Sequence, residues 1–371
     1  MNICRITRPP IKEISSGFPQ REFHILSRLQ GRGHNITHYM IQPAGIRDKY
    51  LSYGLGLLRS VLRFRRNDLD VIMADNIEAA VAALCIKFLY GIPFVFDFID
   101  DYSLIAGYDS FKLRHVFIRF CERLLPRFAD LVIVVDEHKR RFCARAGIPE
   151  ERIVLIPVGT DTERFHPGIT PVAEICRFVL DSHKVVLFVG KLNKYYRLES
   201  FIEAAPLVTK KFPDARFVVV GDGDNTEELK CLCGRLGMEE VIYFAGHRQY
   251  REMPGFIARA DLCFFPLPDS SALALYEYMA CGKPTVIPDY HTEKMGISGD
   301  LLPERCIVKA EDSPEGVAEK ITELLENADL RDRVGREARH FVEQFHGWDA
   351  LVQKFESAFV TAAAGKRRWK S

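Results

Sequence analysis

The chain repeats one pattern along most of its length: a short apolar run, a turn, and then a helical segment. In the first half, strands are predicted at residues 2–6, 36–41, 71–74, 94–96, 131–135 and 154–156. In the second half the pattern restarts, with strands predicted at residues 185–189, 217–221, 241–245, 262–265 and 285–287. Strands separated by helices connect through right-handed crossovers and form a parallel sheet. The sequence therefore predicts an α/β protein with two doubly wound parallel sheets.

The two blocks of strands indicate two domains. Residues 162–183 lose the periodicity and contain two prolines and a glycine, which is typical of a linker. A length of 371 residues also fits two domains better than one. We expect an N-terminal domain at residues 1–165, a C-terminal domain at 183–345, and a helix at 346–371 that packs back on the N-terminal domain. The apolar stripe of that helix is Trp348, Leu351, Val352, Phe355 and Phe359.

Composition and charge exclude several classes of function. The chain is 47% hydrophobic and 27% charged, as soluble globular proteins are. With 51 basic and 50 acidic residues its net charge is +1, so we expect no nucleic-acid partner. The first residues, MNICRITRPPIKE, lack the apolar core of a signal peptide, and no uncharged run approaches the ~18 residues that span a bilayer. The ten cysteines lack zinc-site spacing, so we expect reduced thiols in a cytoplasmic protein.

The segment 261–284, DLCFFPLPDSSALALYEYMACGKP, carries the strongest functional signal. An apolar strand leads through a polar loop into a helix with a single carboxylate, Glu277. The unpaired N–H groups and the dipole at a helix start favour a bound anion. Because Glu277 lies one turn further along, it could reach a ribose hydroxyl. The segment therefore indicates a ligand that contains a nucleotide.

Three glycine-containing loops follow strands earlier in the second half. They are GKLNK at 190–194, GDGD at 221–224 and GHR at 246–248. Glycine lets a backbone approach a ligand closely, and Lys191 and Lys194 could neutralise a diphosphate. Glycine after a strand is more often just a turn. Three such loops in order, followed by the Glu277 segment, favour a nucleotide site more strongly than any one of them.

The motifs FVGKL, IEAAPLV, VVVGDGD, VIYFAGH, IARADLCFFP and LYEYMACGKP, in this order and spacing, resemble the donor half of retaining GT-B glycosyltransferases of the group 1, or family 4, type. LQGRGHNITHY, LDVIMADN, ADLVIVVDEHKRRF and GIPEERIVLIPVGTDTERFHP resemble the other half more loosely. The resemblance covers nearly the whole chain. It implies two Rossmann-like domains that face each other across a cleft, the first binding an acceptor and the second a nucleotide sugar.

The resemblance also implies roles for single residues. Glu277 would bind the ribose of the donor, backbone groups at the start of its helix would hold the diphosphate, and Gly17 would lie beneath the phosphates. The residues expected near the reacting groups are Asp269, Lys191 and Asp100. The residues expected to bind the donor are Glu277, Gly17, Gly190, Lys194, Gly221, Gly223, His247, Arg248, Ser271, Ala272 and Leu273.

Some positions depart from the family pattern. Tyr196 stands where the family often has a cation for the phosphate, although Lys194 lies two residues away. Ile99 replaces a histidine that often lies near the sugar, and three carboxylates stand close to it in sequence: Asp97, Asp100 and Asp101. These departures leave two alternatives open. One is a degenerate binding or scaffold protein, and the other is a sugar-nucleotide epimerase of the same fold.

The resemblance implies a reaction that retains the anomeric configuration and needs no metal and no cofactor. The expected partners are a nucleotide sugar and a glycan or lipid-linked acceptor in cell-envelope polysaccharide biosynthesis. Two basic and apolar segments, 50–66 and 112–127, could attract an anionic membrane to the N-terminal domain, so we expect peripheral attachment on the cytoplasmic face. A solvated helix face over an ordinary core stripe explains these segments slightly better, and both alternatives stay open.

Overall fold

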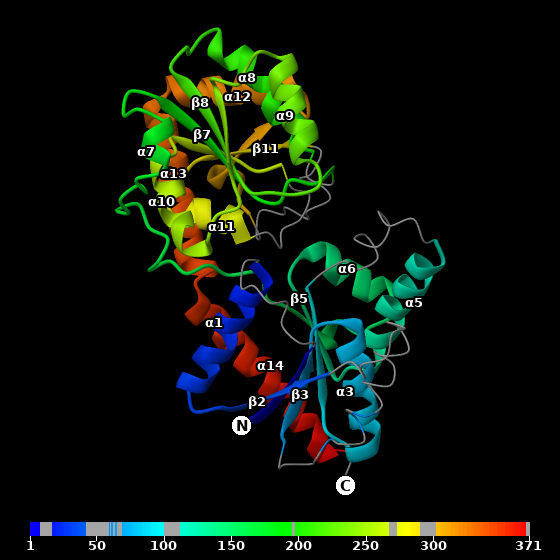
Figure 1. Cartoon of the computed structure of the whole chain (residues 1–371). Helices are drawn as coiled ribbons and strands as arrows, with labels where there is room; N and C mark the ends of the chain where they lie inside the picture. The colour runs from blue at the N-terminus through cyan, green and yellow to red at the C-terminus, as the bar shows by residue number, and fades with distance from the viewer. Residues whose placement is uncertain are drawn as a thin grey trace. The chain divides into compact units, whose positions relative to one another are not determined.

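The computed structural model describes residues 1–7, 17–41, 59, 61, 64, 69–99, 112–194, 197–266, 273–289 and 302–368. The chain forms two compact units (Figure 1). One consists of Met1–Pro157 and Asp349–Ser371, and the other of Val158–Trp348. The chain thus divides at residue 158, so the segment 162–183 that we expected as a linker belongs to the second unit. It contains the short helix α7 (Ile175–Phe178).

The N-terminal unit is built on a six-stranded parallel sheet in the order β2-β1-β3-β4-β5-β6. Its strands are β1 (Asn2–Thr7), β2 (Asn35–Met40), β3 (Val71–Ala74), β4 (Phe94–Phe98), β5 (Leu131–Val134) and β6 (Ile153–Leu155). Its helices are α1 (Gly17–Gly31), α3 (Ile77–Tyr90), α5 (Lys112–Phe128), α6 (Glu137–Arg145), η1 (Glu150–Arg152) and α14 (Trp348–Arg368). Every strand predicted in this half is confirmed to within two residues.

Local chemistry defines the ends of the helices in this unit. The Asn76 side chain accepts a hydrogen bond from the backbone N–H of Ala79 at 2.9 Å and starts α3, and Gly91 ends it with a positive φ of 64°. The last helix, α14, is joined to α1 by ion pairs from Arg28 to Asp349 at 3.0 Å and from Arg32 to Glu356 at 3.1 Å. The apolar stripe of α14 is buried.

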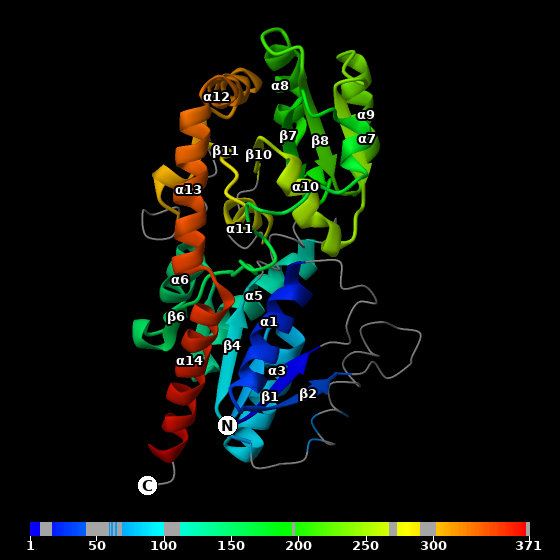
Figure 2. The same ribbon diagram turned by 90° about the vertical axis from the view of Figure 1, so that its left-hand side faces the viewer.

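The C-terminal unit has a second six-stranded parallel sheet, in the order β12-β11-β10-β7-β8-β9. Its strands are β7 (Lys184–Val189), β8 (Ala215–Val220), β9 (Ile242–Gly246), β10 (Leu262–Phe264), β11 (Thr285–Pro288) and β12 (Val308–Ala310). Its other elements are α7, α8 (Glu199–Thr209), α9 (Thr226–Arg235), η3 (Tyr250–Glu252), α10 (Met253–Arg259), α11 (Leu273–Ala280), η5 (Glu304–Cys306), α12 (Pro314–Glu326) and α13 (Ala328–Phe345). In Figure 2, α8 and α12 lie close together beside the sheet.

The strand orders locate a switch point in each sheet. In the C-terminal unit the chain passes from β7 to β8 and β9 on one side, and then returns to β10, β11 and β12 on the other. In the N-terminal unit β1 is likewise flanked by β2 and β3. Ligands of doubly wound sheets bind outside the carboxyl ends of the strands at this point. The relevant edge of the C-terminal sheet is therefore the one where β7 and β10 end.

No helix among the described residues is both long enough and apolar enough to cross a membrane.

Candidate functional site

The three glycine-containing loops of the second half lie side by side at the carboxyl edge of the C-terminal sheet. The backbone N–H of Gly190, after β7, donates to the carbonyl of Val220 at 3.0 Å, and the N–H of Gly221, after β8, donates to that of Gly246 at 2.9 Å. The N–H of Leu192 donates to the Asp222 carbonyl at 3.1 Å. The loops that the sequence singled out thus form one continuous backbone surface.

Two of the glycines in these loops are required by packing between the loops. A Cβ on Gly221 would lie 1.8 Å from the carbonyl oxygen of Gly190, and Gly221 has a positive φ of 145°. A Cβ on Gly223 would lie 2.1 Å from the carbonyl oxygen of Leu192. The absence of a side chain at these two positions lets the β7 loop and the β8 loop touch. This packing explains why glycine is needed at Gly221 and Gly223 without any contact to a ligand.

The basic side chains at this edge differ in their surroundings. Lys191 is exposed and forms no ion pair with the described residues. Lys194 is also exposed but pairs with Glu228 at 2.9 Å, which raises the pKa of Lys194. His247 is exposed, whereas Arg248 pairs with Glu174 at 2.5 Å. Of these two lysines, only Lys194 has its charge compensated by a carboxylate among the described residues.

Glu277 is a buried carboxylate on α11, with only 3% of its surface exposed. The phenolic hydroxyl of Tyr250 donates a hydrogen bond to Glu277 Oε1 at 2.8 Å. Burial raises the pKa of Glu277 from its usual 4.5 to about 7, although the Tyr250 bond and the nearby Arg164 act in the opposite direction. Such a shift corresponds to about 3 kcal/mol of unfavourable burial when the carboxylate is ionised. A buried acid held at this cost is typical of a functional site.

Helix α11 is firmly attached to the elements around it. The Tyr278 hydroxyl accepts a hydrogen bond from the backbone N–H of Val189, at the end of β7, at 2.6 Å. Arg339 on α13 donates to the carbonyl of Ala280 at 2.6 Å, and the Tyr276 ring stacks on His346 with centroids 4.1 Å apart. The carboxylate of Glu277 is therefore presented from a rigid support.

Several predicted site residues lie outside the described residues: Asp269, Ser271, Ala272, Asp100, Asp101 and Tyr196. Of the remaining ones, Leu273 is the first residue of α11 and is 9% exposed. Gly17 is the first residue of α1 in the N-terminal unit.

The N-terminal unit contains a buried charged cluster that the sequence analysis missed. Arg21 binds Asp97 through two hydrogen bonds of 2.6 and 3.2 Å, and Arg5 forms ion pairs with Glu22 and Asp75. Asp97 is fully buried, so its carboxylate belongs to this internal cluster.

The cluster lies at the switch point of the N-terminal sheet. Arg5 is on β1 and Asp75 directly follows β3. The cluster surrounds a cavity of about 10 Å³ that Ile99 also lines. A volume of this size admits roughly one water molecule.

A sequence signal for this cluster did exist. Arg5 stands in the strand NICRIT and Asp97 in the strand FVFDF, where every neighbour is apolar or small. A charge inside a buried strand requires a partner of opposite charge, because an unpaired one costs several kcal/mol. The partners, however, are 76 residues apart in sequence for Arg21 and Asp97, and only the fold brings them together.

Glu22 gives a testable prediction about stability. Burial raises its pKa from 4.5 to about 7 even though Arg5 is adjacent. The folded protein thus binds the proton more tightly than the unfolded chain, and this contribution to stability is complete below pH 4.5 and lost as the pH rises to 7. Glu22→Gln should therefore match the parent protein at pH 4 and be more stable by about 1–3 kcal/mol at pH 8. Urea unfolding at both pH values measures the difference, and equal stabilities at pH 8 would contradict the role of burial.

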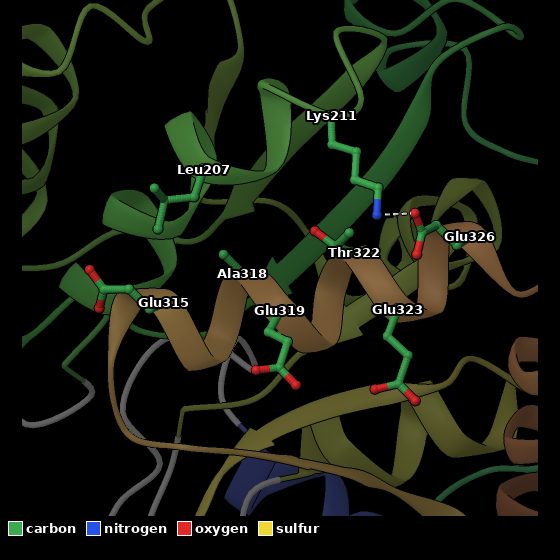
Figure 3. A pocket seen from close by; sticks show the side chains of 8 residues that line it. All are labelled: Leu207, Lys211, Glu315, Ala318, Glu319, Thr322, Glu323 and Glu326. Atoms are coloured by element: carbon green, nitrogen blue, oxygen red, sulfur yellow. Dashed lines mark ion pairs between the residues drawn. The ribbon is translucent and has the colours of Figure 1, made fainter.

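A shallow hollow of about 490 Å³ lies between α8 and α12 (Figure 3). Its lining includes four glutamates of α12, namely Glu315, Glu319, Glu323 and Glu326, and a single lysine, Lys211, which pairs with Glu326. An anionic lining repels phosphate. This hollow is therefore not a site for a nucleotide diphosphate.

Within the described ranges, no group of three or more His, Cys, Asp or Glu side chains is arranged to hold a metal ion.

Comparison with known families agrees with this geometry. Residues 178–341 match the family model of glycosyl transferases group 1, and residues 20–159 match that of the glycosyl transferase 4-like domain. Together with the two doubly wound sheets, these matches show that the chain belongs to the group 1 glycosyltransferases and has the GT-B fold.

Individual proteins resemble the chain at low identity. D-inositol 3-phosphate glycosyltransferase of Corynebacterium aurimucosum is 26% identical over 256 residues, covering 66% of this chain and 60% of that protein. The chain spans about three-fifths of the length of the curated relatives it matches.

Two solved structures share the fold. Sucrose-phosphate synthase of Thermosynechococcus elongatus has a TM-score of 0.79 at 16% identity, covering 98% of this chain and 99% of that one. Anabaena HepE in complex with UDP and glucose has a TM-score of 0.74 at 19% identity, covering 96% and 99%.

Proposed function

We propose that this protein transfers a sugar from a nucleotide-diphosphate sugar to a hydroxyl group of a glycan or lipid-linked acceptor. The observation that carries the proposal is Glu277, a buried carboxylate beside the switch point of the C-terminal sheet, where the three glycine-containing loops also lie. Membership of the group 1 glycosyltransferases supports it. In this proposal the C-terminal unit binds the donor and the N-terminal unit binds the acceptor.

In the proposed complex, each part of the donor has its own contact. Glu277 accepts hydrogen bonds from ribose hydroxyls, while Lys191 and the backbone N–H groups at the start of α11 bind the diphosphate. Asp269 and Asp100 are proposed to lie near the transferred sugar. HepE binds UDP, so uridine nucleotides are the first donors to test.

The chemistry we propose retains the anomeric configuration and needs no metal. The bond between the anomeric carbon and the phosphate oxygen breaks, and the acceptor oxygen attacks from the same face of the sugar. The leaving phosphate takes the acceptor proton. The protein then contributes positioning and stabilisation of the negative charge that develops on the diphosphate.

Product analysis tests this proposal. The protein is incubated with UDP-glucose, GDP-mannose or ADP-glucose, with and without EDTA, and the anomeric proton of the product is followed by NMR. We expect slow release of free sugar with the donor's configuration, unaffected by EDTA. Binding without any turnover would support the scaffold alternative, and conversion of the sugar without release of nucleotide would support an epimerase.

We also propose that helix α5 attaches the N-terminal unit to an anionic membrane at the cytoplasmic face. Val116 and Phe120 on this helix are 64% and 59% exposed, and the exposed Arg119 and Arg123 lie on the same stripe. Apolar side chains beside cations suit a lipid surface, to which each cation adds ~1 kcal/mol of attraction. Most of the other segment that we expected to contribute, 50–66, lies outside the described residues.

Replacing Arg119 and Arg123 together by glutamate should release the protein from vesicles with 30% phosphatidylserine, reducing the bound fraction by about tenfold or more. The matched control replaces Arg333 and Arg336 on α13 of the C-terminal unit, which are equally exposed, with the same change of charge. Cosedimentation measures both variants. Equal partitioning of the α5 variant and the parent protein would reject membrane attachment through this helix.

A further inference from the structure

A buried carboxylate can recognise a ribose only if its orientation is fixed. Among the described residues, Tyr250 is the sole side chain that donates a hydrogen bond to the Glu277 carboxylate, and it does so through Oε1 at 2.8 Å. Tyr250 lies in η3, which follows the β9 loop, 27 residues before Glu277 in sequence. No function described so far uses this tyrosine.

We propose that Tyr250 is a positioning residue for Glu277: its hydroxyl holds Oε1 and so leaves Oε2 available to hydroxyl groups of the donor ribose. This inference rests on the proposed function, because it deepens the role of the same site. It assigns to Tyr250 no direct contact with the ligand.

The structure holds Tyr250 from several sides. The Arg164 guanidinium lies over its ring at 4.7 Å from the centroid, and the Phe165 ring packs against it with centroids 5.8 Å apart. Arg339 donates to the carbonyl of Phe165 at 2.6 Å and also to that of Ala280 on α11. Arg339 thus connects Phe165, which packs against Tyr250, to α11, which carries Glu277.

The short helix η3 is itself fixed in place. The backbone N–H of Gln249 donates to the Glu252 carboxylate at 2.9 Å, within a capping box that defines the start of η3. The tyrosine hydroxyl therefore approaches Glu277 from a defined direction. A hydrogen bond between two well-supported groups orients its acceptor more strictly than a bond from a mobile side chain.

The test is ribose discrimination by the full-length protein. UDP, GDP and ADP, and the 2′-deoxy and 3′-deoxy forms of each, are titrated by calorimetry against the parent protein and against Tyr250→Phe. In the parent protein, we expect the ribose form to bind about 10–100-fold more tightly than a deoxy form, as is usual for a hydrogen bond to a charged group. In Tyr250→Phe, we expect this ratio to fall by about 5–10-fold.

Tyr278→Phe is the matched control. It removes a phenolic hydroxyl from the fully buried Tyr278 on α11, whereas Tyr250 is partly buried, and that hydroxyl binds the backbone of Val189 and not Glu277. Both variants are expected to lose stability, which urea unfolding measures. Only Tyr250→Phe should change the ratio between ribose and deoxyribose, because a smaller folded fraction weakens all nucleotides equally.

The possible results of these titrations distinguish a failure of the positioning role of Tyr250 from a failure of the proposed function. If the parent protein discriminates ribose and Tyr250→Phe keeps the full ratio, Tyr250 does not position Glu277 and the proposed function stands. If Tyr278→Phe lowers the ratio as much as Tyr250→Phe does, the effect is a general loss of packing and the inference is wrong. If the parent protein binds none of the three nucleotides, the proposed function and this inference fall together.

Discussion

Glu277→Gln is expected to bind a nucleoside diphosphate about 10–100-fold more weakly than the parent protein while unfolding less readily at pH 8. The two effects have opposite signs because the carboxylate is buried. Only 3% of the Glu277 surface is exposed, so water solvates its ionised form poorly, and this burial raises its pKa to about 7. Glutamine keeps the size and can still accept the Tyr250 hydrogen bond, but it carries no charge.

The gain in stability should depend on pH. At pH 4, Glu277 is protonated both in the folded protein and largely in the unfolded chain, so glutamine brings no advantage. As the pH rises from 4.5 to 7, the folded protein loses the stability that its tightly held proton provides. At pH 8 the variant should therefore be more stable by about 1–3 kcal/mol.

Calorimetric titration and urea unfolding on the same preparations measure both effects. Glu22→Gln is a suitable control, because it also removes an acid whose pKa burial raises, but one that is only partly buried and lies in the N-terminal unit. It should gain stability at pH 8 without any loss of nucleotide affinity. Undiminished affinity in Glu277→Gln would remove the ribose role from this residue.

Gly221→Ala is the second change for which we expect a large effect, a loss of about 3–5 kcal/mol of stability. The new Cβ would lie 1.8 Å from the carbonyl oxygen of Gly190, which is a backbone atom at the end of the central strand and cannot move aside. The positive φ of 145° is also a conformation that only glycine adopts readily. The clash can be relieved only if the loop after β7 and the loop after β8 move apart.

Gly237→Ala provides the comparison for this prediction. Gly237 also has a positive φ, of 66°, but a Cβ there meets no atom within 4 Å. Its replacement should cost only about 1 kcal/mol, the usual penalty of the left-handed conformation. Urea unfolding of both variants separates the contribution of the clash from that of the backbone angle. Similar losses in the two would show that contact between the loops adds nothing.

Much of the fold was predictable because buried parallel strands are continuous apolar runs. Val185 to Phe188, for example, are completely buried, and such a run bounded by glycine or polar residues marks a strand without any alternation. β12 was missed because it has only three residues, two of them partly exposed. The division at residue 158 was also missed, since 162–183 lacks periodicity but still packs within the C-terminal unit, where Phe165 and Ile175 are buried.

The gathering of the three loops at one edge was predictable because each loop follows a strand, whereas contacts between distant side chains were not. Gly190, Gly221 and His247 each follow a strand, so their gathering at one edge follows from the parallel order. Nothing in the sequence pairs Tyr250 with Glu277, because a hydrogen bond between η3 and α11 depends on how both elements pack. The close packing of Gly221 against Gly190, and of Gly223 against Leu192, could not be predicted from the sequence for the same reason.

Hydrogen–deuterium exchange with and without a nucleotide sugar tests most directly whether the carboxyl edge of the C-terminal sheet holds the donor. With saturating UDP-glucose, or whichever of the three donors binds, we predict slower exchange in peptides that cover Gly190–Lys194, η3 and α11. Peptides from α8 and α12, which line the acidic hollow, should be unchanged. Protection confined to that hollow, or absent from α11 while the donor is bound, would contradict the account.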